Sequence, residues 1–315
     1  MSPEGVGTVD DDLKELVQTS VSQALATGSD DIGAALAEFG WAELAAADEA
    51  FAFTTLFEEQ GRQAADTDAL DVVTMALLGI QVAGAVIWPI GRVPGEGVAS
   101  EGMNVHGVAL RPVAEAGRTI FVPVGGTLHV LAPSSIEETT LGGMASDARW
   151  VRVQASGDGV FFQGSWPEIE RRCRLALGSE LVGLCQRIID TAVEHVSARR
   201  QFGRPIGTYQ AVRHRLAEAY AEMVGAQALI AAAWEDGSPD AATVAKAVAG
   251  SAHDVVSKQA IQVCGAIGLS EEHELPSLVR RGFALDALLG ASRPVPSKFG
   301  NRILAGERLE PVGQF

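Results

Sequence analysis

The sequence Arg199-Arg200-Gln201-Phe202-Gly203-Arg204-Pro205-Ile206, followed by Gln210, lies between two long helical patterns. A guanidinium group can donate two parallel hydrogen bonds to phosphate oxygens. A phenyl ring offers a flat apolar wall to a cofactor, and the Gly and Pro break a helix and fix a turn. The stretch therefore predicts a turn that can contact a phosphorylated cofactor.

Helical periodicity surrounds this turn, and a β-rich segment lies further upstream. Apolar residues at three- and four-residue steps predict helices over 10–78, 167–196, 208–235, 239–264, 275–289 and 297–304. Short Val- and Gly-rich runs predict strands at 85–88, 119–124, 128–131 and 150–153. The order of helices, strands and helices predicts an α+β fold, mostly α, and not a doubly wound sheet.

The same pattern divides the chain into segments. We expect a disordered tail over 1–9, an N-terminal helical domain over 10–90, a reduced β domain over 91–165 and a C-terminal four-helix bundle over 166–315. The bundle is the expected oligomerisation surface.

Charge and composition exclude several classes of function. The net charge of −16 disfavours nucleic acid and anionic membrane as partners. The cysteines are odd in number and lie in apolar segments, and the histidines lack metal-ligand spacing, so we expect reduced thiols and no metal site. Residues 1–12 lack the features of a signal peptide, and polar and helix-breaking residues interrupt the apolar run 72–90, so we expect a cytoplasmic protein.

A second motif, Gln262-Val-Cys-Gly265-Ala-Ile-Gly268, follows the first by about sixty residues. Together the two motifs resemble those of acyl-CoA dehydrogenases, which have Arg-x-Gln-Phe-Gly-x-Pro-Ile and Gln-x-x-Gly-Gly-x-Gly; only Ala266 departs from the second pattern. The resemblance implies FAD as cofactor, contacted from across a subunit interface. It assigns that contact to Arg199, Gln201, Phe202, Gln262 and Gly265. The later pairs Glu272-His273 and Arg280-Arg281 resemble those of a subgroup of acyl-CoA dehydrogenases. This subgroup acts on bulky acyl-CoAs, including steroid side chains.

The family reaction also requires a Glu that removes the α-proton of an acyl-CoA. The two positions at which the family carries this Glu correspond here to Cys173 and Leu289. A leucine cannot accept a proton, and a thiol in an apolar helix is a poor base near neutral pH. The resemblance therefore implies no catalytic residue in this chain. Possible substitutes are poorly placed: Glu180 and Asp286 lie near Cys173 and Leu289 in the sequence, and Glu271, Glu272 and Glu274 stand beside the predicted nucleotide contact.

The β segment also lacks the family's Thr-Glu-Pro…Gly-Ser-Asp and Lys-x-Trp-Ile-Thr/Ser sequences, which hold the flavin ring. The resemblance thus indicates the non-catalytic subunit of a heteromeric acyl-CoA dehydrogenase, similar to the α2β2 enzymes of actinobacterial sterol catabolism. A longer homologue would supply the Glu, the ring pocket and most of the acyl-CoA site, and share its FAD. Two alternatives stay open: a self-sufficient homomeric dehydrogenase with a displaced base, and a non-enzymatic scaffold.

Overall fold

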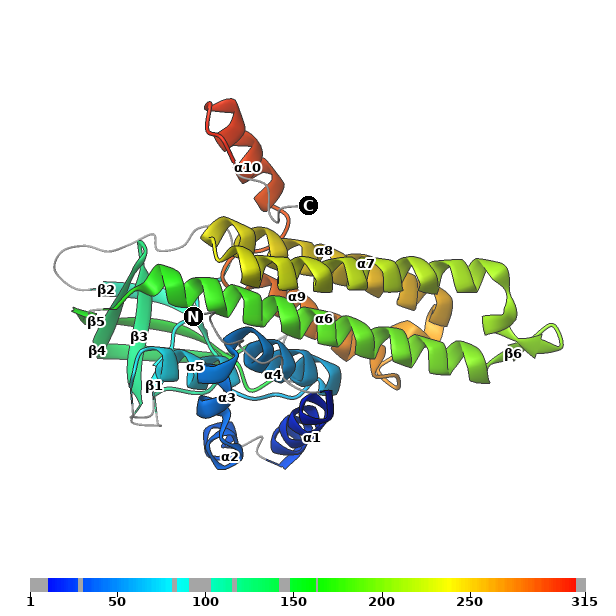
Figure 1. Cartoon of the computed structure of the whole chain (residues 1–315), viewed down its shortest axis with the longest axis horizontal. Coiled ribbons are helices and arrows are strands. Elements are labelled where there is room, and N and C mark those ends of the chain that lie inside the picture. Colours follow the sequence, from blue (N-terminus) through cyan, green and yellow to red (C-terminus); the bar gives the residue numbers. More distant parts are fainter. Residues whose placement is uncertain are drawn as a thin grey trace, which may run out of the picture.

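A computed structural model gives the architecture of the chain and describes residues 11–27, 31–80, 84–90, 103–114, 118–141, 148–162 and 164–309. The described part has N-terminal helices, a small sheet and a C-terminal bundle of long helices (Figure 1). The expected α+β class with mostly helical content is confirmed. The predicted tail over residues 1–9 lies outside the described residues, and the proposed domain limits stay a prediction.

In the described part of the chain, five helices precede the sheet: α1 (Asp11–Thr27), α2 (Ile32–Phe39), α3 (Trp41–Ala47), α4 (Glu49–Gln63) and α5 (Ala69–Leu77). Two of them begin at aspartates whose carboxylates accept backbone N–H groups that have no partner within the helix. Asp31 accepts from the N–H of Ala34 at 3.0 Å, and Asp48 accepts from that of Phe51 at 2.9 Å. Gly40 takes a φ of 80° between α2 and α3, a conformation that favours glycine.

The sheet contains β1 (Gly84–Val86), β2 (Met103–Ala109), β3 (Thr119–Val124), β4 (Thr127–Thr140) and β5 (Val151–Phe162), in the order β1-β3-β4-β5-β2. β1 is parallel to β3, and the other pairs are antiparallel. Two hydrogen bonds between Trp88 and Val108, of 2.8 and 3.0 Å, join the chain after β1 to β2. The sheet therefore closes on itself around its own apolar side chains, among them Ile120, Val122 and Val153.

The C-terminal bundle consists of α6 (Trp166–Ala198), α7 (Gln210–Asp236), α8 (Pro239–Cys264) and α9 (Leu275–Ala287). In Figure 1, α6, α7 and α8 lie side by side and extend away from the sheet, and α10 (Val295–Leu304) projects from the bundle. These helices lie within about two residues of the predicted ranges. The apolar residues of α6 to α9 face a common core, which explains their regular spacing. No helix in the described ranges has the length and apolar character needed to cross a membrane.

The crossing of α4 and α6 requires two glycines. A Cβ on Gly61 would lie 2.0 Å from the carbonyl oxygen of Glu180, and one on Gly183 would lie 1.9 Å from that of Glu58. These distances are far below van der Waals contact, so the two backbones can approach only without side chains at these positions. The crossing fixes the N-terminal helices against the bundle.

Candidate functional site

The predicted cofactor-contacting turn is a short hairpin at the end of the bundle away from the sheet (Figure 1). Strands β6 (Arg200–Gln201) and β7 (Arg204–Pro205) pair, and Phe202 and Gly203 form the turn with φ values of 51° and 83°. Two consecutive positive φ angles are typical of a two-residue type I′ turn. The side chain of Phe202 is 91% exposed. The hairpin thus presents an apolar ring to whatever lies beyond the chain.

Positive charge gathers around this hairpin. Five arginines and no acidic residue occur between positions 199 and 217 of a chain whose net charge is −16. Arg199 is exposed and follows the last residue of α6, with its N–H bonded to the carbonyl of His195 at 2.9 Å. Within the described ranges, none of the five guanidinium groups forms an ion pair. Their charge is therefore available to an anionic ligand.

The second motif lies at the same end of the bundle. Exposed Gln262 stands in the last turn of α8, and Gly265 ends that helix with a φ of 69° before the 3-10 helix η3 (Gly265–Leu269). The side chain of Glu274 then accepts hydrogen bonds from Arg187 at 2.7 Å and Thr191 at 2.6 Å, both on α6. These bonds hold the segment after η3 against the helix that carries Arg199.

Two imidazoles also connect these segments. The rings of His195 and His273 lie edge to face, with centroids 5.8 Å apart. Burial lowers the pKa of His195, and the charges of His273 and Arg199 lower it further. The structure thus brings the two motifs together at one end of the bundle. In the described part of the chain, Arg199 and Gln262 do not bond to one another directly.

The two family base positions are closed by apolar packing. Cys173 is fully buried on α6, with its sulfur 3.4 Å from the hydroxyl of Thr74, and burial raises the pKa of its thiol to about 12. Leu289 is 5% exposed with a φ of 53°, and its N–H donates to the carbonyl of Pro89 at 3.1 Å. Arg174, which follows Cys173, donates to the carbonyl of Leu289 at 3.5 Å. The structure therefore places both positions in one neighbourhood.

Three of the other carboxylates have structural partners. Glu180 is 2% exposed and accepts hydrogen bonds from Gln60 at 2.9 Å and from Arg281 at 2.6 Å. Asp286 accepts from the N–H and hydroxyl of Ser292, and Glu274 bonds to α6 as described above. The remaining two, Glu271 and Glu272, are exposed beside η3. None of these contacts assigns a proton-transfer role to a carboxylate.

A buried carboxyl that the sequence analysis did not single out lies close to Cys173. Asp71 on α5 is 1% exposed. Its Oδ1 accepts a hydrogen bond from the indole N–H of Trp88 at 2.8 Å. Its Oδ2 has no hydrogen-bond partner in the described part of the chain. Burial raises the pKa of Asp71 to about 7. The only sequence signal was an acidic residue inside an apolar helix, Ala69–Leu77.

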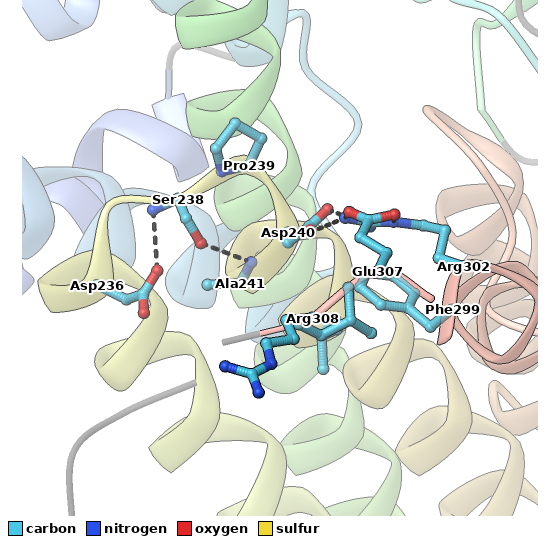
Figure 2. Close-up of a pocket in the computed structure, with 11 residues that line it drawn as sticks. Asp236, Ser238, Pro239, Asp240, Ala241, Phe299, Arg302, Glu307 and Arg308 are labelled. Atoms are coloured by element: carbon cyan, nitrogen blue, oxygen red, sulfur yellow. Dashed lines mark hydrogen bonds and ion pairs between the residues drawn. The ribbon is translucent and has the colours of Figure 1, made fainter. Parts of the chain in front are cut away.

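A pocket of about 550 Å³ lies at the other end of α7, between the α7–α8 turn and α10 (Figure 2). Arg302 crosses it and bonds to Asp240 at 2.8 and 2.6 Å, and to Glu307 at 2.8 Å. A helix of 27 residues separates this pocket from the Phe202 hairpin, a span of about 40 Å.

Among the described residues, no group of His, Cys, Asp or Glu side chains could hold a metal ion.

Known proteins share both sequence and fold with this chain. A family profile described as "Acyl-CoA dehydrogenase, C-terminal domain" matches residues 171–292. Acyl-CoA dehydrogenase IpdE2 of Mycobacterium tuberculosis is 33% identical over 129 residues, which is 41% of this chain and 41% of that protein. The chain thus matches about two fifths of the length of such curated relatives.

Solved structures match over nearly the whole chain. A variant of the Tcur3481-Tcur3483 steroid ACAD has a TM-score of 0.75 at 19% identity and covers 94% of this chain and 98% of that one. The ChsE4-ChsE5 complex from Mycobacterium tuberculosis has a TM-score of 0.69 at 19% identity, with coverage of 97% and 100%. At these identities the likeness shows the fold. This chain therefore has the fold of acyl-CoA dehydrogenases, and its residues 171–292 match the profile of their C-terminal domain.

Proposed function

We propose that this chain is the non-catalytic subunit of a heteromeric acyl-CoA dehydrogenase and contributes to the binding of an FAD shared with its partner. The partner is a longer homologue that carries the catalytic Glu and most of the acyl-CoA site, in an α2β2 assembly. FAD accepts hydride at the flavin ring when an acyl-CoA is desaturated between its α and β carbons. In this chain, Arg199, Gln201, Phe202, Gln262 and Gly265 hold the nucleotide part of FAD.

The observation that carries this proposal is the exposed hairpin at residues 200–205, with Arg199 directly before it. Its arginines form no ion pairs among the described residues, and Phe202 is 91% exposed at its tip. A diphosphate is a suitable ligand for such guanidinium groups. A flat apolar ring is a suitable contact for the phenyl group. Because the hairpin extends from the end of the bundle (Figure 1), its ligand is best supplied by a second subunit.

The environment of the base positions supports a non-catalytic role. Cys173 and Leu289 are buried at 0% and 5% exposure, and the raised pKa of the thiol keeps it protonated near neutral pH. The buried indoles of Trp88 and Trp166, with centroids 6.2 Å apart, lie in the same apolar core. Abstraction of an α-proton requires a base in contact with the substrate, and these residues offer none.

The names of two structural neighbours and two residue pairs of this chain bear on the acyl group. The Tcur3481-Tcur3483 protein is named as a steroid ACAD, and ChsE4-ChsE5 is named as a complex. The Glu272-His273 and Arg280-Arg281 pairs agree with the subgroup that acts on bulky acyl-CoAs. We therefore propose a bulky or steroid side-chain acyl-CoA as substrate of the complex.

Co-expression with a candidate longer homologue tests the proposal. The two chains are expected to purify together as a yellow complex that desaturates a steroid-side-chain acyl-CoA, whereas this chain alone is colourless or insoluble because its bundle surface is unpaired. A yellow and active preparation of this chain alone would instead favour the self-sufficient enzyme. Arg199 and Gln201 substitutions without any effect on the complex would favour the scaffold.

A further inference from the structure

The hairpin at residues 200–205 is too small to be rigid by itself. Each strand has two residues, and Phe202 adopts a left-handed backbone that is strained for a bulky side chain. The exposed Phe202 ring gains no packing that would offset this strain. A hairpin with this geometry needs support from residues outside its own strands.

Two side chains provide such support. The guanidinium carbon of Arg204 lies 4.2 Å from the centroid of the Tyr209 ring, a cation–π contact. The hydroxyl of Tyr209 donates to the carbonyl of Gln201 at 3.3 Å. That carbonyl belongs to the peptide group directly before Phe202, so the bond fixes the orientation of the peptide that leads into the strained turn.

Tyr209 is itself held by the bundle. It caps the N-terminus of α7, where its carbonyl accepts the N–H of Arg213 at 3.1 Å and its own N–H donates to the carbonyl of Ile206 at 3.1 Å. Just before it, Gly207 approaches α6 so closely that a Cβ would lie 3.1 Å from the side chain of Val196. The contacts of Tyr209 therefore connect the hairpin tip to α7, and Gly207 places this connection against α6.

The pair lies at positions that the family pattern leaves open. Arg204 occupies the x of Gly-x-Pro-Ile, and Tyr209 falls between Ile206 and Gln210, outside the matched residues. The contacts in the structure, rather than the motif, single these residues out.

We propose that Tyr209 and Arg204 are positioning residues that hold Gln201 and Phe202 in the geometry that receives the partner's FAD. The proposal rests on the function proposed above and adds to it a support for the hairpin. Ordering the hairpin before the cofactor arrives removes an entropic penalty from binding. Loss of the support is therefore expected to weaken FAD binding, because the hairpin must then become ordered as the cofactor binds.

Substitutions at Tyr209 in the complex test this role with FAD as the probe. Tyr209→Ala removes the ring and the hydroxyl and is expected to weaken FAD binding about 10-fold, whereas Tyr209→Phe keeps the ring under Arg204 and weakens it about threefold or less. Tyr220→Ala is the matched control, because Tyr220 is the other tyrosine of the chain and lies exposed on α7. Unchanged FAD affinity in Tyr209→Ala would overturn the proposal.

A double-mutant cycle separates positioning from a direct contact. If Tyr209 acts through Phe202, then Phe202→Ala and Tyr209→Ala together weaken FAD binding little more than Phe202→Ala alone. Amide hydrogen exchange over residues 200–206 should also accelerate about 10-fold in Tyr209→Ala and stay unchanged in Arg199→Ala. Additive losses with unchanged exchange would refute positioning. Retention of FAD by Arg199→Ala would instead refute the proposed function. In that case, amide hydrogen exchange in Tyr209→Ala would still show whether Tyr209 supports the hairpin.

Discussion

Asp71 and Trp88 form a buried pair in which Oδ1 of the carboxyl accepts the indole N–H at 2.8 Å. Trp88 is fully buried and is followed by Pro89, whose carbonyl accepts the N–H of Leu289 at 3.1 Å. Cys173 lies near this carboxyl: burial raises the pKa of its thiol, and the charge of Asp71 raises it further. The pair therefore connects the N-terminal helices to the neighbourhood of both family base positions.

Asp71→Asn should change how stability depends on pH. Burial raises the pKa of Asp71 from 3.8 to about 7, so the folded chain binds this proton more tightly than the unfolded chain does. Its contribution to stability is complete below pH 3.8 and is lost as the pH rises to about 7. An asparagine keeps an acceptor for Trp88 and cannot ionise.

Denaturation of both proteins at two pH values checks this. The unfolding free energy of Asp71→Asn relative to wild type should increase by about 3 kcal/mol between about pH 5 and about pH 8. Asp68 and Arg118 also face this carboxyl, and Asp68→Asn and Arg118→Gln are suitable controls for their charges. A difference that does not vary with pH would show that Asp71 is ionised in the folded chain throughout.

Gly183→Ala should separate α4 from α6. The new Cβ would lie 1.9 Å from the carbonyl oxygen of Glu58, and a backbone atom cannot move aside as a side chain can. We expect a loss of at least about 2 kcal/mol in the free energy of unfolding, measured by denaturant titration. Gly300→Ala on α10 is the control, because open space surrounds that position and alanine favours a helix by about 1 kcal/mol. Equal stabilities for the two variants would contradict the close crossing.

The sequence predicts the bundle well because its long helices keep a regular apolar spacing. The helix predicted over 239–264 has those bounds in the structure, and α6 differs from its prediction by one residue at the start and two at the end. Strand β2 was not predicted, although its buried and exposed residues partly alternate. Gly107 weakens its strand propensity, and the structure explains that glycine, because a Cβ there would lie 2.6 Å from the carbonyl of Trp88.

The candidate site could also be predicted only in part. Local motifs predict the residues around Arg199 and Gln262, and the structure places both motifs at one end of the bundle; their contact with FAD stays a prediction. Roles that depend on distant partners could not be predicted. Glu180 was a candidate base, but Arg281 lies 101 residues away in sequence and binds it. The Asp71–Trp88 bond likewise depends on the approach of β1 to α5.

Conservative changes at the family base positions should leave turnover of the complex nearly intact. Leu289→Met keeps volume and Cys173→Ala removes only a buried thiol, and on this account neither residue faces a reacting α-carbon. We expect kcat within about twofold of wild type for the complex, measured with a saturating acyl-CoA. A loss of chemistry at Cys173, Asp286 or Glu180 with flavin retained would assign a base to this chain.

Arg199→Ala should release FAD from the complex. Loss of a charge-assisted bidentate pair costs about 2–4 kcal/mol, which is about 30- to 1000-fold in FAD affinity. Arg199→Lys should recover only part of this, because an ammonium group cannot donate as a planar fork. Titration of the apo-complex with FAD measures both variants. Equal affinities for Ala and wild type would remove Arg199 from the cofactor site.

The FAD content of the purified complex tests the central claim most directly. Only one of the two related sites in each heterodimer would have both a flavin-ring pocket from the partner and a nucleotide-binding hairpin from this chain. Flavin absorbance against protein concentration should therefore give about one FAD per heterodimer, and this chain purified alone should give none. A content of two FAD per heterodimer, or a full FAD content in this chain alone, would contradict the account.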